Sequence, residues 1–424
     1  MAAHHRLLLL ATCASFLGAF PAHATTTGGD ENVHAPVDDA PNHEIAAMPH
    51  DEAISATQVS TDETEDEDGW TIAPRGRLQF DFGTVDAPDP LGRADGFDAE
   101  VRRARLGFQG QMPGGFGYKV EADFAGSSVE LADAILTYEA DGLIATIGHH
   151  NNFQGLEELT SSLNISMLER AAYTDAFGFE RRLGTSLQFQ SDAVLLQGGV
   201  FLDNINDLST DNWSADGRVV YMPKSEAGQF HLGASVHYTD FEDDSSVRYR
   251  QRPFVHLTDE RLVNTGQIDA AREFGFGLES AFISGPFHIV AEGFRQSVDR
   301  IEGVAGTTFH GAYGEIGYFL TKGDSRGYKG GKFDRIKPEN PVGSGGIGAV
   351  QIVARYDYLD LNDADVVGGK QNAYGASLIW TPTSYTRLIA SYNRLQYDDA
   401  VHPLPDGTTS YDVDAFGIRA QVDF

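Results

Sequence analysis

Three arginines spaced two residues apart could bind anions along an extended segment. Arg248, Arg250 and Arg252 lie within residues 246–253, and side chains two residues apart in an extended chain point to the same side. The guanidinium group stays charged at any physiological pH, and its planar fork of donors matches phosphate and carboxylate oxygens. We interpret the three residues as an arginine ladder that captures anions and passes them on. The alternative is a solvated loop stem whose arginines pair with the acidic residues 242–244.

A second arginine group is Arg102, Arg103 and Arg105. In a strand, Arg103 and Arg105 would face the same side. On the inner wall of a pore they would add to the anion path. The alternative is that they form interior ion pairs with a carboxylate such as Glu121 or Asp123.

A basic segment stands out against an acidic chain whose formal net charge is −31. Residues 321–349 carry six bases and only three acids, and Arg181 and Arg182 form a further basic pair. At an extracellular mouth the segment would raise the local anion concentration. The alternative is a plain solvated loop without a role in anion binding. The acidic balance itself argues against nucleic-acid binding. The bases of the segment are Lys322, Arg326, Lys329, Lys332, Arg335 and Lys337.

The sequence carries no signature of an enzyme. It has no His-Glu-x-x-His motif, no Gly-x-Ser-x-Gly motif and no phosphate-binding loop. The single cysteine, Cys13, lies in the N-terminal apolar stretch, so a mature chain would have no thiolate for a metal or a disulfide. We expect no catalytic residue, no metal site and no cofactor.

The elements that must position these arginines are β-strands. The last nine residues alternate strictly, and side chains of alternate parity point to opposite faces of a strand. Similar alternating runs recur from Trp70 onward. The length of each run is close to the ~9–11 residues with which a tilted strand crosses a bilayer. A soluble sandwich would explain single strands, but a barrel also explains the many aromatic residues that flank them. The apolar members of the final run are Phe416, Ile418, Ala420, Val422 and Phe424.

The connections between the predicted strands fall into two kinds. Tight Pro- and Gly-containing turns alternate with long polar loops such as residues 149–178, 240–270 and 321–349. Short turns at one end and long loops at the other are typical of outer-membrane barrels. The fold class predicted from the residues is therefore all-β, a transmembrane antiparallel barrel.

The chain divides into three parts by composition. Residues 1–24 have a basic start, an apolar stretch and a small-x-small site, which together predict a cleaved signal peptide. Residues 25–69 hold thirteen acids and no Lys or Arg, which predicts a disordered acidic leader. Residues 70–424 form the predicted barrel.

Several sequence blocks resemble the phosphate-selective porin O and P family, over about residues 74–424. Two are specific: Gly155–Ser162 with its Glu-Glu-Leu-Thr-Ser-Ser core, and Tyr358–Asp363, which reads Tyr-Leu-Asp-Leu-Asn-Asp. The other matching blocks are Arg102–Gly107, Gly117–Lys119, Asp123–Ala125, Leu168–Arg170, Arg181–Gly184 and Arg419–Phe424.

The resemblance implies a sixteen-stranded, trimeric outer-membrane barrel whose third loop, here residues 149–178, folds inward to constrict the pore. Arg248, Arg250 and Arg252 look like the family's arginine ladder. Arg170, with Arg102 and Arg103, looks like part of the constriction zone. In this chain residues 140–180 contain no lysine, although phosphate-selective members keep lysines there, so a broader anion range is implied. The predicted constriction-loop residues are Glu157, Glu158, Thr160, Ser161 and Ser162.

These observations predict a passive outer-membrane channel of a Gram-negative bacterium for anions, phosphate or polyphosphate among them. The predicted partners are inorganic anions, outer-membrane lipid and two further copies of the chain in a homotrimer, with no nucleic acid. Arg103, Arg105 and Arg170 would hold the anion at the narrowest part. Two alternatives remain: a general small-solute diffusion porin with weak selectivity, and a non-conducting barrel used for adhesion or scaffolding.

Overall fold

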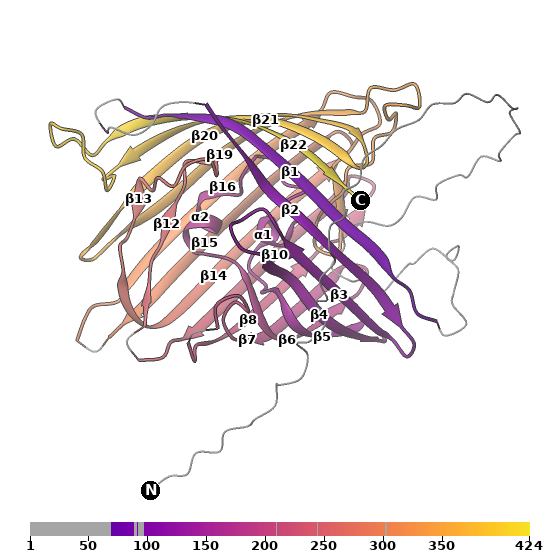
Figure 1. The fold of residues 1–424 in the computed structure, drawn as a ribbon, viewed down its shortest axis with the longest axis horizontal. Helices are drawn as coiled ribbons and strands as arrows, with labels where there is room; N and C mark the ends of the chain where they lie inside the picture. Colours follow the sequence, from indigo (N-terminus) through magenta and orange to yellow (C-terminus); the bar gives the residue numbers. More distant parts are fainter. Residues whose placement is uncertain (1–68, 89–90, 92–96, 209, 244, 302) are drawn as a thin grey trace, which may run out of the picture. The chain divides into compact units, whose positions relative to one another are not determined.

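The computed structural model describes residues 69–88, 91, 97–208, 210–243, 245–301 and 303–424. The predicted signal peptide and all but the last residue of the predicted acidic leader lie outside these residues. The described chain is all-β and closes into a barrel of 16 antiparallel strands (Figure 1). Closure is made by β1 (Ala73–Asp86) and β22 (Tyr411–Asp423), which place Arg77 opposite Asp423. The predicted fold class is confirmed.

Each of the other barrel strands pairs with the next one around the wall. The strands from β3 to β8 are short, with 8–11 residues, whereas those from β14 to β22 have 13–18. The strands are β2 (Phe97–Met112), β3 (Phe116–Asp123), β4 (Glu130–Ala140), β5 (Leu143–Asn151), β6 (Arg181–Gln190), β7 (Val194–Phe201), β8 (Trp213–Tyr221), β10 (Gly228–Asp240), β14 (Ile268–Ser284), β15 (Phe287–Arg300), β16 (Thr307–Phe319), β19 (Ala349–Asp363), β20 (Val366–Thr383) and β21 (Thr386–Asp398).

Short elements decorate the connections between these strands. Two helices, α1 (Leu156–Leu159) and α2 (Ala172–Ala176), lie between β5 and β6. In the described chain no helix has the length and the hydropathy needed to span a membrane. The short strands are β9 (Lys224–Ser225), β11 (Ser246–Val247), β12 (Arg250–Gln251), β13 (Val263–Asn264), β17 (Gly327–Lys329) and β18 (Lys332–Asp334).

The two faces of each strand follow the alternation in the sequence. On β22, Phe416 and Ile418 point outward and are exposed. Arg419, the residue after Ile418, points inward and is fully buried. Apolar side chains therefore meet lipid, and polar ones line the interior, as expected for a membrane barrel.

The ends of the barrel can be distinguished by their connections. The end that holds the last residue of β22 has tight turns such as residues 113–115, 285–286 and 384–385. The opposite end has long loops, including residues 152–180 and 241–267. Because outer-membrane barrels have short periplasmic turns and longer extracellular loops, we assign the first end to the periplasm.

The basic segment 320–348 is the exception, and its predicted place at an extracellular mouth is wrong. It connects β16 to β19, and both of these strands meet it at the tight-turn end. The strand order explains the error. Residues 301–306, between β15 and β16, are a short connection at the extracellular end, so the next connection falls at the periplasmic end. The segment then turns into the barrel, where Arg326 is buried and donates to the carbonyl oxygen of Asn164.

Loop 152–180 enters the barrel from the extracellular end, as the family resemblance implied (Figure 1). It begins at residue 152, after β5, rather than at 149. Inside, it meets the periplasmic segment, since the Phe333 amide donates to the hydroxyl of Thr160 at 3.2 Å. The interior is thus filled from both ends.

An aromatic core fixes loop 152–180 against one side of the wall. Tyr173 and Phe177 of the loop pack against Phe294 of β15 and Tyr249 of loop 241–267. The stacked rings of Tyr173 and Phe294 have centroids 6.1 Å apart. On the opposite side, formed by β1 to β8, the loop makes a smaller aromatic contact, Phe153 against Phe201 of β7, and a cavity separates much of the loop from the wall.

Candidate functional site

Two cavities lie between the loops and the wall. The inner cavity, about 410 Å³, runs along β1 to β8 and ends at the periplasmic segment 320–348. The outer cavity, about 190 Å³, lies under the extracellular loop 241–267. The outer cavity is lined by side chains that include Arg102, Glu169, Thr174, Asp175, Arg252 and His256.

Four residues line both cavities and therefore mark the junction between them. They are Arg103 of β2 and Glu158, Arg170 and Phe179 of loop 152–180. An anion moving from the extracellular side to the periplasm through these cavities must pass this set of side chains. The structure thus brings Arg103 and Arg170 together at this junction, and their role at a constriction stays a prediction.

A β-bulge directs two successive arginines inward. Gln79 of β1 pairs with Arg103, but the next residue, Phe80, pairs with Val101, so Arg102 is the extra residue. Such a bulge kinks the strand and re-aims side chains. As a result both Arg102 and Arg103 border cavities, which strict alternation would not allow.

Arg103 differs from the other arginines near it. Its guanidinium donates to the side-chain oxygen of Gln79 at 3.0 Å, and the described residues place no carboxylate oxygen within 4.0 Å of it. Arg102, in contrast, pairs with Glu169 at 3.0 Å, and Arg105 with Asp123 at 2.7 Å. The predicted alternative of an interior ion pair thus holds for Arg105. Arg103 therefore makes no close ion pair at the junction, although Glu169 acts on it at longer range.

Arg170 is held by the end of α1. Its guanidinium donates to the carbonyl oxygens of Glu157, Glu158 and Thr160 at 3.1, 3.2 and 2.9 Å. Its partner carboxylate is Glu158, at 3.3 Å. Burial raises the pKa of Glu158, although Arg170 and Arg181 oppose the shift. The junction therefore combines one unpaired arginine with one arginine–carboxylate pair.

The Glu169 carboxylate supplies negative charge to the arginines near the junction. Burial alone would raise its pKa, but Arg102, Arg419 and Arg103 outweigh burial and hold the pKa well below its ordinary value. Arg419 also donates to the carbonyl oxygen of Leu168 at 2.6 Å. This part of the loop is thus tied to the wall by charge.

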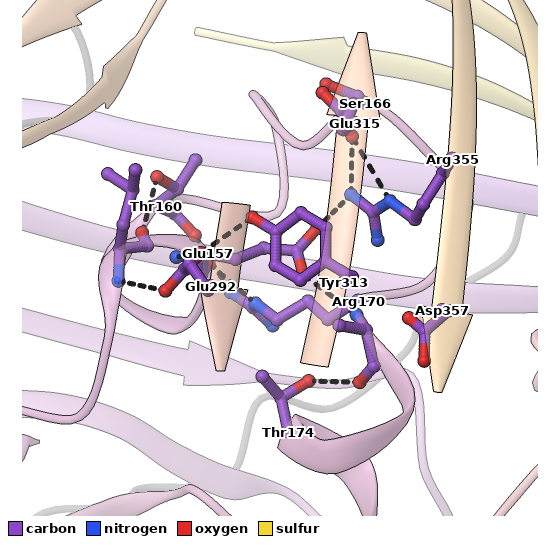
Figure 2. Close-up of polar contacts among 12 residues, drawn as sticks. Glu157, Thr160, Ser166, Arg170, Thr174, Glu292, Tyr313, Glu315, Arg355 and Asp357 are labelled. Atoms are coloured by element: carbon purple, nitrogen blue, oxygen red, sulfur yellow. Dashed lines mark hydrogen bonds and ion pairs between the residues drawn. The ribbon is translucent and has the colours of Figure 1, made fainter. Parts of the chain in front are cut away.

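Two carboxylates of the wall latch the back of loop 152–180, and a third carboxylate, from the loop itself, braces it internally (Figure 2). Glu292 of β15 accepts from the backbone amides of Leu156 and Glu157 at 2.7 and 2.9 Å. Glu157 accepts from the amide of Ala171 at 2.8 Å, and Asp357 of β19 accepts from the amide of Ala172. These amides start α1 and α2, where helices leave N–H groups without a partner.

Arg355 closes this latch from the side of β19. In Figure 2 its guanidinium reaches both Glu157 of the loop and Glu315 of β16, and the distance to Glu315 is 2.6 Å. Its guanidinium also lies 4.4 Å from the ring centroid of Tyr313. Tyr313 in turn donates to Glu292 at 2.6 Å. The side chains of this network are buried and bind one another, so they hold the loop in place.

The structure separates the predicted site residues into three sets. Arg103, Arg105 and Arg170, with Glu158, Thr160, Ser161 and Ser162, border the inner cavity, and Arg102 borders the outer one. Glu157 faces the wall instead. Of the predicted arginine ladder, Arg252 lines the outer cavity, whereas Arg248 and Arg250 are exposed and line neither of these cavities.

The structure also brings cations to the inner cavity that the sequence reasoning did not place there. Lys329 and Lys332 arrive from the periplasmic segment, Lys119 from β3 and Arg218 from β8. The alternating runs around Lys119 were visible in the sequence, and counting the connections would have placed Lys329 and Lys332 at the periplasmic end. No sequence signal shows that their segment turns inward. Lysines thus reach the cavity from a different segment than residues 140–180.

No metal or cofactor site emerges from the described side chains. They contain no cluster of three or more His, Cys, Asp or Glu side chains suited to a metal ion. The chemistry offered by the two cavities is charge and hydrogen bonding.

Comparison with known proteins agrees with this architecture. The family model described as phosphate-selective porin O and P matches residues 72–424. An uncharacterized protein of Caulobacter vibrioides is 45% identical over 364 residues, which is 82% of this chain and 73% of that protein.

Solved structures similar in fold are outer-membrane proteins of low sequence identity. OmpT of Vibrio cholerae matches with a TM-score of 0.56 at 10% identity, over 85% of this chain and 99% of OmpT, and a trimer form of OmpT also matches. An anion-selective porin from Comamonas acidovorans matches with a TM-score of 0.54 at 11% identity, over 84% of this chain and 100% of that porin. These likenesses concern the fold alone.

Proposed function

Because the chain belongs to the phosphate-selective porin O and P family and is therefore an outer-membrane channel, we propose that it passes small anions, phosphate among them, by passive diffusion. The observation that carries the proposal is the position of Arg103, an arginine without a close ion pair, at the junction of the two cavities. A fixed cation at the narrowest part of a pore attracts anions and repels cations.

The proposed path is a series of basic side chains. Arg252 and Arg102 border the outer cavity, Arg170 and Arg103 the junction, and Arg105 the inner cavity. At each step, guanidinium donors would replace part of the hydration shell of the anion. Binding must stay weak and spread over several sites so that the ion also leaves. Lys329 and Lys332 would receive the ion at the periplasmic side.

Arg248 and Arg250 would have a lesser role in this path. They are exposed on the extracellular loop 241–267, so they would act at a distance by raising the local concentration of anions. The inward step of the predicted ladder would then rest on Arg252 alone.

A general diffusion pore with weak selectivity is the second candidate. The observation that favours it is the pairing of most cavity cations with carboxylates: Arg105 with Asp123, and Lys119 with Asp133 at 2.7 Å. Paired charges exert a weaker field on a passing ion than free ones.

We also propose that the channel is a homotrimer in the outer membrane. Support comes from the trimer form of OmpT and from the sector of short strands between β3 and β8. β3 and β7 have 8 residues each, below the ~9–11 residues that span a bilayer, so a second copy of the barrel could cover this sector. A predicted export signal in residues 1–24 would deliver the chain.

Phosphate block of the chloride current tests the proposal. In planar bilayers the native protein should show chloride current that falls as phosphate is added, because phosphate occupies the junction. Arg103→Gln should raise the half-blocking phosphate concentration about fivefold, the equivalent of about 1 kcal/mol for one charge pair in water. The matched control is Arg295→Gln, which removes an exposed arginine of β15 and should leave the block unchanged.

Three results would discriminate the candidate functions. Equal phosphate block in the native protein and Arg103→Gln would contradict the role of Arg103. Ion current without any phosphate block would favour the general diffusion pore. The lack of any current from correctly folded protein would favour a scaffold.

A further inference from the structure

We propose that the inner cavity recognises organic anions that carry several hydroxyl groups, the class that includes sugar acids. The charged group of the solute would lie at Lys119 of β3, and its hydroxyl groups would lie against a neutral polar wall. This inference rests on the proposed anion channel and names its solute class. Bare phosphate would use only the charged part of the cavity.

The neutral wall begins with a row of hydroxyl groups across three adjacent strands. Thr137 of β4 pairs with Thr146 of β5, and Thr146 pairs with Ser186 of β6. Directly opposed residues share one face of a sheet, and all three line the inner cavity. Thr137 also pairs with Gly117 of β3, and Lys119 follows two residues later on the same face of that strand. Lys119 lines the inner cavity too, so a single solute could contact both Lys119 and the hydroxyl row.

The hydroxyl groups of this row make few hydrogen bonds within the protein. Within the described residues, neither Thr137 nor Thr146 has a side-chain hydrogen bond, and Ser186 has only a long contact of 3.4 Å with a ring nitrogen of His150. A hydroxyl group offers one donor and two acceptor positions. The row therefore keeps hydrogen-bonding capacity for molecules that enter the cavity.

Two further side chains of β5 point to the same kind of ligand. His149 lines the inner cavity and is only 1% exposed, and its ring nitrogens make no hydrogen bond within 3.5 Å among the described residues, although the backbone of Arg181 lies close to the ring. The amide oxygen of Asn151, which also lines the cavity, is buried without a partner there. Buried polar atoms are almost always hydrogen-bonded, so these atoms suit a ligand that brings its own donors and acceptors.

The size and charge of the cavity agree with such a solute. At about 410 Å³ the inner cavity lies within the ~300–1,000 Å³ range of sites for small organic molecules. Its basic half attracts a carboxylate or phosphate group, whereas a neutral hydroxyl and amide wall adds little to the binding of a charge alone. A wall that hydrogen-bonds hydroxyl groups discriminates against analogues that lack them.

Competitive block with matched anions tests this inference in the full-length protein in planar bilayers. The probes are gluconate, hexanoate, which has the same six-carbon chain without hydroxyl groups, and phosphate. Gluconate should block chloride current at a concentration about threefold lower than hexanoate, within the range expected for one net hydrogen bond. In the double variant Thr137→Val, Thr146→Val this preference should fall to about one.

A matched control and a phosphate arm separate the two proposals. Thr185→Val removes an exposed hydroxyl of β6 on the lipid side, and should preserve the gluconate preference. Equal block by gluconate and hexanoate in the native protein would overturn the hydroxyl site, even if phosphate still blocks. A preference that survives in the double variant would overturn the assignment to the hydroxyl row. Failure of all three anions to block would instead contradict the proposed anion channel.

Discussion

Loop 152–180 has two faces that differ in chemistry, and the adjacent residues Glu157 and Glu158 of α1 illustrate the difference. Glu157 points to the wall, where it binds Arg355 and the amide of Ala171. Glu158 points to the cavities, where it pairs with Arg170. The latched face uses charge to fix a position, and the cavity face uses charge to act on passing ions.

The comparison predicts that a substitution on the latched face changes the channel current more than one on the cavity face. Arg355→Ala leaves the buried Glu157 and Glu315 without their cation, and breaking a buried ion pair costs about 3–5 kcal/mol. The loop should then leave its position, so that the single-channel conductance rises at least about twofold and the open-channel current becomes noisier. Single-channel recording measures both quantities.

The control for this prediction is an ion pair on the outer surface. Arg394 of β21 pairs with Asp412 and Asp414 away from the cavities. Arg394→Ala should leave conductance and noise unchanged. Arg355→Lys should restore part of the native behaviour. An Arg355→Ala channel with native conductance and noise would show that the loop does not depend on the latch.

On the cavity face, an unpaired arginine should matter more than a paired one. Arg103→Gln should lower the chloride-to-potassium permeability ratio about fivefold, because a cation without a close ion pair leaves the junction. Arg105→Gln should lower it less than about twofold, because Asp123 already neutralises Arg105. The ratio comes from reversal potentials in a salt gradient. Equal effects of the two variants would contradict the distinction.

Glu158 predicts a pH dependence of selectivity. Its pKa is raised above the ordinary value of 4.5 by burial, so on acidification it becomes neutral before an ordinary carboxylate does. Anion preference should therefore increase, by about twofold, as the pH falls from neutral toward 4.5. In Glu158→Gln the preference should be high at neutral pH and nearly constant over this range. If the anion preference of Glu158→Gln changes with pH as in the native protein, another group than Glu158 causes the pH dependence.

The periplasmic lysines predict the smallest effect. Lys329→Gln with Lys332→Gln should reduce chloride conductance by less than about twofold, since charges that border a water-filled cavity are screened over ~8 Å at physiological salt. The reduction should disappear at 1 M salt. Conductance measured at several salt concentrations checks this, and an effect that persists at high salt would place the lysines in direct contact with the ion.

The barrel itself could be predicted from the sequence because its pattern is local. In the final strand, alternate residues such as Phe416 and Arg419 reveal which face meets lipid and which is buried. Tight turns, for example residues 284–286, set the limits of hairpins. Both signals depend only on neighbouring residues. The inward course of loop 152–180 came from the family resemblance.

The site was less predictable because it depends on contacts between distant parts of the chain. Nothing in a Glu-Glu pair tells which carboxylate meets Arg355, which lies about 200 residues later. The bulge that turns both Arg102 and Arg103 inward is a property of the pairing with β1. The inward fold of the periplasmic segment likewise depends on packing, including the contact of Phe333 with Thr160.

The zero-current potential of the native channel across a tenfold gradient of KCl tests the central claim most directly. An arginine without a close ion pair at the junction predicts a potential whose sign corresponds to chloride as the more permeant ion. It also predicts that the potential moves toward zero when phosphate is added to occupy Arg103. A native potential at zero, or one with the sign of potassium preference, would contradict the account.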